Sequence, residues 1–84
     1  MTEVAYELVI VGGRLEPGRE IEQAEELIAL VDAAGGRSLG PWEYHFTSLD
    51  AAQAGVSCFR RLGVEFSGFQ IKAVDADTGD ALVS

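Results

Sequence analysis

Residues 37–46 read Arg-Ser-Leu-Gly-Pro-Trp-Glu-Tyr-His-Phe, and this stretch decides which fold the chain can adopt. From Trp42 to Phe46 aromatic residues alternate with polar ones, which is the period of a β-strand with one apolar face. Gly40-Pro41 in front of it is a typical turn signal. We therefore expect residues 42–46 to form a strand. Residues 37–39 either extend it or form a short strand that pairs with it through a hairpin.

The chain before this stretch predicts a strand and then a helix. Val4–Val11 is rich in β-branched residues and largely alternates in polarity, so we expect a strand with Val4, Tyr6, Leu8 and Ile10 on the core side. Between Arg19 and Ala34 apolar residues recur at helical spacing, and Gly35-Gly36 suits the end of a helix. The residues expected on the buried side of this helix are Ile21, Ala24, Leu27, Ile28, Val31 and Ala34.

The chain after it predicts a second helix and a last strand. Ser48 is a suitable N-cap, and Gly63 suits the end of this helix. The residues expected on its buried side are Leu49, Ala52, Val56, Phe59 and Leu62. Residues 64–76 then predict a strand, bent at Gly68, with Phe69, Ile71 and Ala73 facing the core. Residues 77–80 indicate a turn, and residues 81–83 a short returning edge strand.

This order of elements predicts an α+β fold. If Gly40-Pro41 makes a hairpin, the order is the split β-α-β arrangement (βαββαβ) of ferredoxin-like folds, here with a short extra C-terminal strand. Such a fold is a two-layer sandwich with both helices on one face of an antiparallel sheet. The alternative is a small three-layer α/β sheet, whose two faces 84 residues can hardly cover. We expect a single globular domain over residues 1–84.

Acidic residues dominate the charge of the chain. Fourteen Asp and Glu oppose six Lys and Arg, for a formal net charge of −8. Such a charge repels nucleic acid and anionic lipid and attracts basic protein surfaces. The apolar runs are far shorter than the roughly 20 residues that cross a bilayer, so no membrane partner is expected. A single cysteine, Cys58, fits a reducing compartment, and we expect a cytoplasmic protein.

The helix predicted over residues 19–34 has an acidic side. On a helical wheel its carboxylates fall together, opposite the apolar arc, and Arg19 is the only base in the segment. One interpretation is a face that keeps the protein in solution. The other is a docking surface for a basic protein, including a nucleic-acid-binding protein, with Trp42 as an apolar anchor. The residues predicted for docking are Glu22, Glu25, Glu26, Asp32 and Trp42.

A second polar group is predicted on the open face of the sheet. Glu43 and His45 alternate with the aromatic residues of their strand, and Lys72 is expected on the same face. His45 is the only histidine, so an enzyme would have to use it as acid or base. Cys58 is expected in the helix layer, away from His45, which argues against a Cys–His catalytic pair. The sequence therefore predicts no catalytic residues.

Two other motifs fail on spacing. Gly12-Gly13 follows a strand, but Arg14 occupies the position where a dinucleotide-binding loop needs glycine. Residues 75–80 resemble the start of a calcium loop, but the glycine is one place early and the closing glutamate is missing. We expect a plain loop and a hairpin turn, with no metal site and no cofactor.

Three hypotheses for function follow. The leading one is a small acidic protein-binding module, namely an inhibitor, immunity protein or regulatory adaptor, which in the extreme case mimics nucleic acid. The second is a homodimer that pairs open sheet faces or edge strands and holds a small ligand between subunits, with Glu43, His45 and Lys72 in the cleft. The third is a small enzyme that uses His45. Of these, we expect a binding protein rather than an enzyme.

Overall fold

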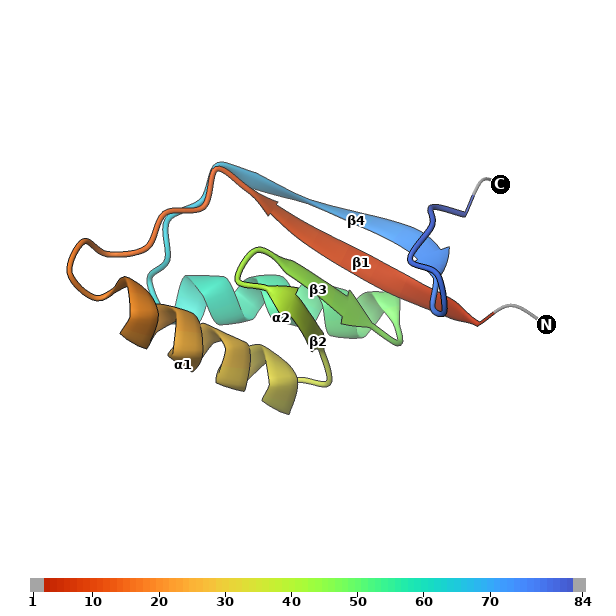
Figure 1. Cartoon of the computed structure of the whole chain (residues 1–84), viewed down its shortest axis with the longest axis horizontal. Coiled ribbons are helices and arrows are strands. Elements are labelled where there is room, and N and C mark those ends of the chain that lie inside the picture. The colour runs from red at the N-terminus through yellow and green to blue at the C-terminus, as the bar shows by residue number, and fades with distance from the viewer. Residues whose placement is uncertain (1–2, 83–84) are drawn as a thin grey trace.

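The computed structural model describes residues 3–82, and within them it contains two helices and a four-stranded sheet. The strands lie in the order β2-β3-β1-β4, and every neighbouring pair is antiparallel. The predicted α+β class is therefore confirmed (Figure 1). In chain order the elements are β1 (Val4–Val11), α1 (Glu20–Ala33), β2 (Arg37–Gly40), β3 (Glu43–Phe46), α2 (Leu49–Arg61) and β4 (Gly68–Asp75).

Residues 37–46 form a hairpin of two short strands. Arg37 pairs with His45 and Ser38 with Tyr44, and the register shifts between Ser38 and Gly40. The Ser38 hydroxyl donates to the carbonyl of Gly40 at 3.0 Å, which closes the end of the hairpin. Gly40-Pro41 thus turns the chain, which decides for the hairpin and against a single strand, and gives the sheet its fourth strand.

The core lies between the helices and one face of the sheet. Leu8 of β1 is the register partner of Tyr44 of β3, so both side chains leave the sheet on the same side. Leu27 of α1 and Phe59 of α2 pack with them in one cluster of buried side chains. Both helices cover this side (Figure 1). The three-layer alternative is therefore wrong, because its second covering layer does not exist within residues 3–82.

The hydroxyl of Tyr44 lies at the margin of this core. Tyr44 is fully buried, and its hydroxyl donates to the carbonyl of Pro41 at 2.9 Å. Burial, with a smaller contribution from the Cys58 thiol, raises the pKa of Tyr44 to about 12. The phenol therefore satisfies its own donor and fixes the turn that precedes β3.

Several side chains expected in the core are exposed instead. Ile21 and Leu49 each lie in the first turn of a helix and are not among the residues that the helix buries. On α1 the buried position near this end is taken by Gln23. The last strand begins only at Gly68, because residues 64–67 cross from α2 back to the sheet and do not join its ladder.

The segment after β4 folds back over the sheet. Ala81 bridges to Val74, and the Leu82 amide donates to the carbonyl of Ala73 at 3.1 Å, as a short edge strand requires. A Cβ built on Gly79 would lie 3.9 Å from the His45 ring, so the preceding turn comes close to the open face. The expected turn is confirmed; Val83, the last residue of the predicted edge strand, lies outside the described residues.

Candidate functional site

The acidic residues predicted on the first helix are all exposed on α1. Glu22, Glu25, Glu26 and Asp32 form what we call the acidic face of α1. The last three have no cationic partner within 4 Å among residues 3–82, so their charges are open to solvent and to a binding partner.

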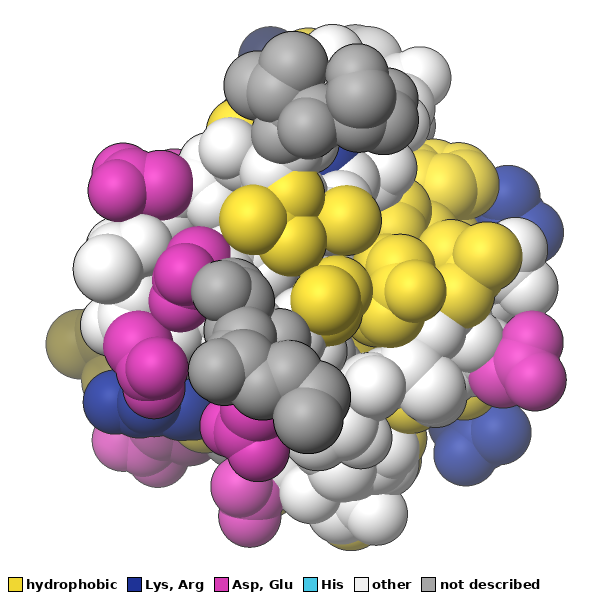
Figure 2. Space-filling model, turned by 90° about the vertical axis from the view of Figure 1, so that its right-hand side faces the viewer, with side chains coloured by type: hydrophobic (Ala, Val, Ile, Leu, Met, Phe, Trp, Pro, Cys, Tyr) yellow, Lys and Arg dark blue, Asp and Glu magenta, His cyan; other side chains and the backbone are white. Residues whose placement is uncertain are grey.

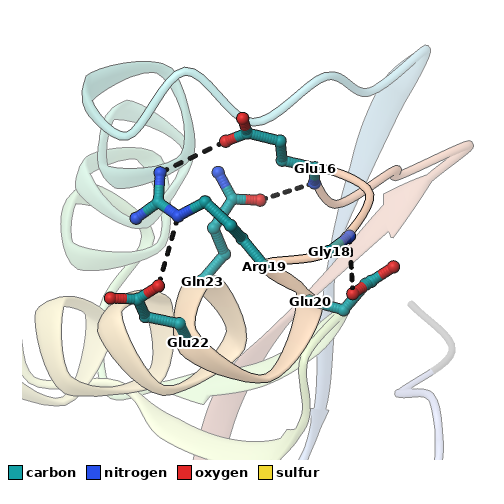
Figure 3. A network of polar contacts seen from close by, with 6 residues as sticks. All are labelled: Glu16, Gly18, Arg19, Glu20, Glu22 and Gln23. Atoms are coloured by element: carbon teal, nitrogen blue, oxygen red, sulfur yellow. Dashed lines mark hydrogen bonds and ion pairs between the residues drawn. The ribbon is translucent and has the colours of Figure 1, made fainter.

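Glu22 differs because Arg19 partly neutralises it. The Arg19 guanidinium lies 3.2 Å from Glu22 and 3.2 Å from Glu16, so one cation bridges two carboxylates (Figure 3). The hydrogen bond and charge of Glu22, followed by the charge of Glu16, raise the pKa of Arg19. All three side chains are exposed, so the pairs add little to stability. Their effect is to hold Glu22 at the start of the acidic face.

The start of α1 has no side-chain N-cap. Ser48 accepts a hydrogen bond from Ala51 at the start of α2, but Arg19 makes no such bond at α1. The Glu20 carboxylate instead accepts from the amide of Gly18, in the loop before the helix, at 3.1 Å (Figure 3). Hydrogen bonds from the amides of Glu20 and Gly18 lower the pKa of Glu20. Glu20 therefore adds an acidic residue to the first turn of α1, beside the loop.

Ile21 is an apolar residue beside these carboxylates. Its side chain is 78% exposed, the largest exposed fraction among the bulky apolar residues of the described chain. It lines a shallow depression of the surface together with Glu22 and Glu25. Periodicity assigned Ile21 to the core, so sequence reasoning missed this residue. The signal that could have found it is its place in the first turn, where a helix can extend past its sheet.

Trp42 contributes to the core more than to the surface. Its ring lies 6.2 Å from that of Phe59, tilted by 34°, and covers Gly13, where a Cβ would collide with the indole. The side chain is partly buried and packs against the core cluster. Within the described chain, Ile21 is therefore the better placed apolar anchor for a partner.

The open face of the sheet carries a row of charged residues. Register places Arg37, His45, Glu7 and Lys72 side by side, one on each strand. Glu7 is central, since its carboxylate lies 3.1 Å from His45 Nε2 and 3.5 Å from Lys72 Nζ. The structure thus brings His45 and Lys72 together through Glu7, which the predicted set did not include. Glu43 is not part of this contact, because it pairs with Val9 further along β1.

The central part of this row is mostly covered. The side chains of His45 and Glu7 are only 15% and 16% exposed. Cys58 lies in the helix layer, with its Sγ 3.9 Å from the carbonyl of Leu30. The expected separation of Cys58 from His45 is therefore observed. The polar contacts of the row join β1, β3 and β4 through the Glu7 carboxylate, and Arg37 of β2 lies beside His45 by register only.

Within residues 3–82, no group of three or more His, Cys, Asp or Glu side chains could hold a metal ion. Neither α1 nor α2 is long and apolar enough to cross a bilayer. Comparison of the chain with protein-family models, curated proteins and solved structures gave no match.

Proposed function

We propose that this chain is a small acidic protein-binding module, not an enzyme, and that the acidic face of α1 docks on a basic protein surface. The observation that carries the proposal is Ile21, which is 78% exposed beside the carboxylates of Glu22 and Glu25. An apolar side chain ringed by charges is the usual composition of an interface centre and its rim.

The charges support a partner of opposite sign. A net charge of −8 raises the rate of encounter with a basic surface and repels nucleic acid itself. Glu22, Glu25 and Glu26 lie within about one helical turn of each other, because an α-helix rises about 1.5 Å per residue. Inhibitors, immunity proteins and regulatory adaptors use such surfaces. In the extreme case the partner is a nucleic-acid-binding protein, and the carboxylates would then occupy the places of the phosphates of its nucleic acid.

Reversing the charge of the acidic face should abolish binding to the partner. We expect the Glu22→Lys/Glu25→Lys/Glu26→Lys variant to lose a partner that the natural chain captures from native cell extract at moderate salt. The matched control is Glu43→Lys/Asp50→Lys/Glu65→Lys, which changes the net charge equally at exposed positions outside the face. Ile21→Ser should weaken capture but keep its salt dependence. Equal loss in both triple variants would mean that net charge alone matters and that α1 is no docking site.

We further infer a ferredoxin-like sandwich. Its support is that both β-α-β units are split by a strand of the other unit. In β1-α1-β2 the two strands are separated by β3, and in β3-α2-β4 they are separated by β1. Both helices cover one sheet face, as such a sandwich requires (Figure 1). A cytoplasmic location is proposed for the same protein on the single cysteine, Cys58, whose thiol is buried.

A second candidate function is self-association through β4, which is an edge strand of the sheet. The Ala73 carbonyl and the Asp75 amide bond the C-terminal segment, so the odd-numbered residues of β4 direct their backbone groups away from β1. Among residues 3–82, Phe69 and Ile71 therefore have outward backbone groups with no partner, and Phe69 is 43% exposed. Apolar side chains gather at the opposite end of β4, where β1 begins (Figure 2). A second copy would pair strand to strand along Phe69 and Ile71, which the C-terminal segment up to Leu82 leaves free.

This candidate predicts a concentration-dependent dimer that a proline abolishes. Ile71→Pro removes an outward amide and no bond to β1, so the monomer should keep its fold while pairing is blocked. We expect the natural chain to approach twice the monomer mass in sedimentation as its concentration rises, and the variant to stay monomeric. A natural chain that is monomeric throughout, or a variant that dimerises equally, would contradict pairing through β4.

A further inference from the structure

The free edge of β4 is a short stretch with a defined midpoint. β4 lies at one edge of the sheet, beside β1 (Figure 1). At one end the C-terminal segment covers this edge as far as Ala73, whose carbonyl accepts the Leu82 amide at 3.1 Å. At the other end the strand begins at Gly68. Within the described chain this leaves residues 68–72 uncovered, with Gln70 at their midpoint.

The outward backbone groups of this stretch suit one antiparallel register with a second copy. In an antiparallel ladder, two residues that lie opposite each other in a hydrogen-bonded pair exchange both of their bonds. Phe69 and Ile71 are the residues with free outward groups. A register centred on Gln70 places Phe69 of each copy opposite Ile71 of the other, so every free group of both residues finds a partner.

The two neighbouring registers meet groups that are already bonded. A register centred on Ile71 would place Phe69 opposite Ala73, whose carbonyl accepts the Leu82 amide. A register centred on Phe69 would place Ile71 opposite Ser67, whose amide donates to the carbonyl of Val11 at 2.9 Å. The bonds within one chain therefore favour Gln70 as the centre.

The side chains fit the same register. Ile71 is the register partner of Leu8, so Phe69 and Ile71 both leave the sheet on the side that the helices cover. Phe69 is exposed and Ile71 is partly exposed, and across the pair each would cover the other. Aromatic and β-branched residues opposite each other stabilise a sheet. This contact requires antiparallel pairing about a two-fold axis, which keeps the helices of both copies on one side of the joined sheet.

Charge does not oppose this contact, although the chain carries a net charge of −8. Residues 66–74 contain no Asp or Glu, and their single charged residue is Lys72. Lys72 Nζ lies 3.5 Å from the Glu7 carboxylate of β1, so this cation is turned over the sheet and away from the free edge. In the register centred on Gln70, Lys72 lies opposite Gly68 of the second copy, so no like charges face each other.

We propose that two copies of this chain pair through β4 in an antiparallel register centred on Gln70, which joins their sheets into one. The inference rests on the self-association proposed for β4 and adds which residues meet. The two Gln70 residues face each other at the two-fold axis, in a pair without backbone hydrogen bonds. Their Cα atoms would lie about 4.5 Å apart, within the range of roughly 4.4–6.8 Å that a disulfide spans.

Engineered disulfides test this register, in a chain whose own cysteine is removed by Cys58→Ala. We expect Gln70→Cys to give a covalent dimer on mild oxidation, measured by electrophoresis without reductant. Lys72→Cys is the matched control on the same exposed face. It should cross-link with itself at least about tenfold more slowly, because its two copies would lie about 13 Å apart along the strands.

A mixture of two variants is a second test of the same register. Gly68→Cys and Lys72→Cys should cross-link with each other as readily as Gln70→Cys does with itself, because the register places residues 68 and 72 opposite each other. A Cβ built on Gly68 has no heavy atom within 4 Å, so the chain has room for this substitution. The mixture also tests the register if Gln70→Cys does not fold.

Sedimentation of the natural chain separates the register from the self-association on which it rests. A dimer that Ile71→Pro abolishes, but that neither Gln70→Cys nor the mixture cross-links, would overturn the register and leave pairing through β4 in place. Equal cross-linking of Gln70→Cys and Lys72→Cys would also overturn the register. A natural chain that stays monomeric at every concentration would overturn both.

Discussion

The Phe59→Ala variant is expected to lose about 3–5 kcal/mol of unfolding free energy, the usual loss for truncating a buried phenylalanine. Phe59 is fully buried, and its ring meets three others: Trp42 at 6.2 Å, Tyr44 at 5.8 Å and Phe66 at 6.0 Å. Removing it opens a cavity where α2 meets the sheet and the segment that follows α2. A domain of this size has a total stability of only about 4–13 kcal/mol, so the substitution should remove a large share of it.

The measurement is urea unfolding followed by circular dichroism. Phe69→Ala is the matched control, because it removes the same side chain at a position that is 43% exposed. We expect the control to lose roughly 1 kcal/mol or less, as for most surface substitutions. Comparable losses in the two variants would show that Phe59 is not the centre of the core.

We expect the Gly55→Ala variant to be less stable than the natural protein by about 1–3 kcal/mol, although helices favour alanine over glycine. Gly55 is buried in the middle of α2, where helix propensity alone would favour alanine by up to about 1 kcal/mol. A Cβ there would lie 2.5 Å from Phe46 Cζ and 3.3 Å from Leu8 Cδ2. Phe46 and Leu8 are both almost fully buried, so neither side chain has room to move aside.

Gly68→Ala is the matched control for this substitution. Gly68 has no heavy atom within 4 Å of a built Cβ, and its φ lies outside the left-handed region. Alanine should therefore stabilise the protein there by about 0.4–1 kcal/mol, since it restricts the unfolded chain. The double variant Gly55→Ala/Phe46→Leu should recover part of the loss by making room. A neutral or stabilising effect of Gly55→Ala would show that α2 and β3 lie further apart than in the structure.

Local patterns in the sequence were sufficient to predict which segments form helices and which form strands. Alternation from Trp42 to Phe46, the Ser48 cap and the glycines after each helix act within a few residues, so each could be interpreted alone. The boundaries were less accurate. Residues 64–67 have strand-like composition, but they lie outside the ladder because a strand is defined by its neighbours, which no local pattern specifies.

The candidate sites likewise divide into residues that a local pattern predicts and residues that only the folded structure brings together. The wheel placed Glu22, Glu25, Glu26 and Asp32 on one exposed face because helical geometry relates them directly. Ile21 had the right spacing for the core, yet it is exposed, because the buried side of α1 is formed by Gln23, Leu27 and Val31. Glu7 joins His45 and Lys72 only through the order of the strands.

The sequence by itself determined this protein's acidic charge, the types of its elements and the exposed carboxylates of α1. These depend on residue identity and on geometry within one element. The tertiary structure alone decided that residues 37–46 form a hairpin that places β3 beside β1, that Ile21 reaches solvent and that Gln23 lies buried. Each of these depends on contacts between residues far apart in the chain, whose energies are set only when the layers pack.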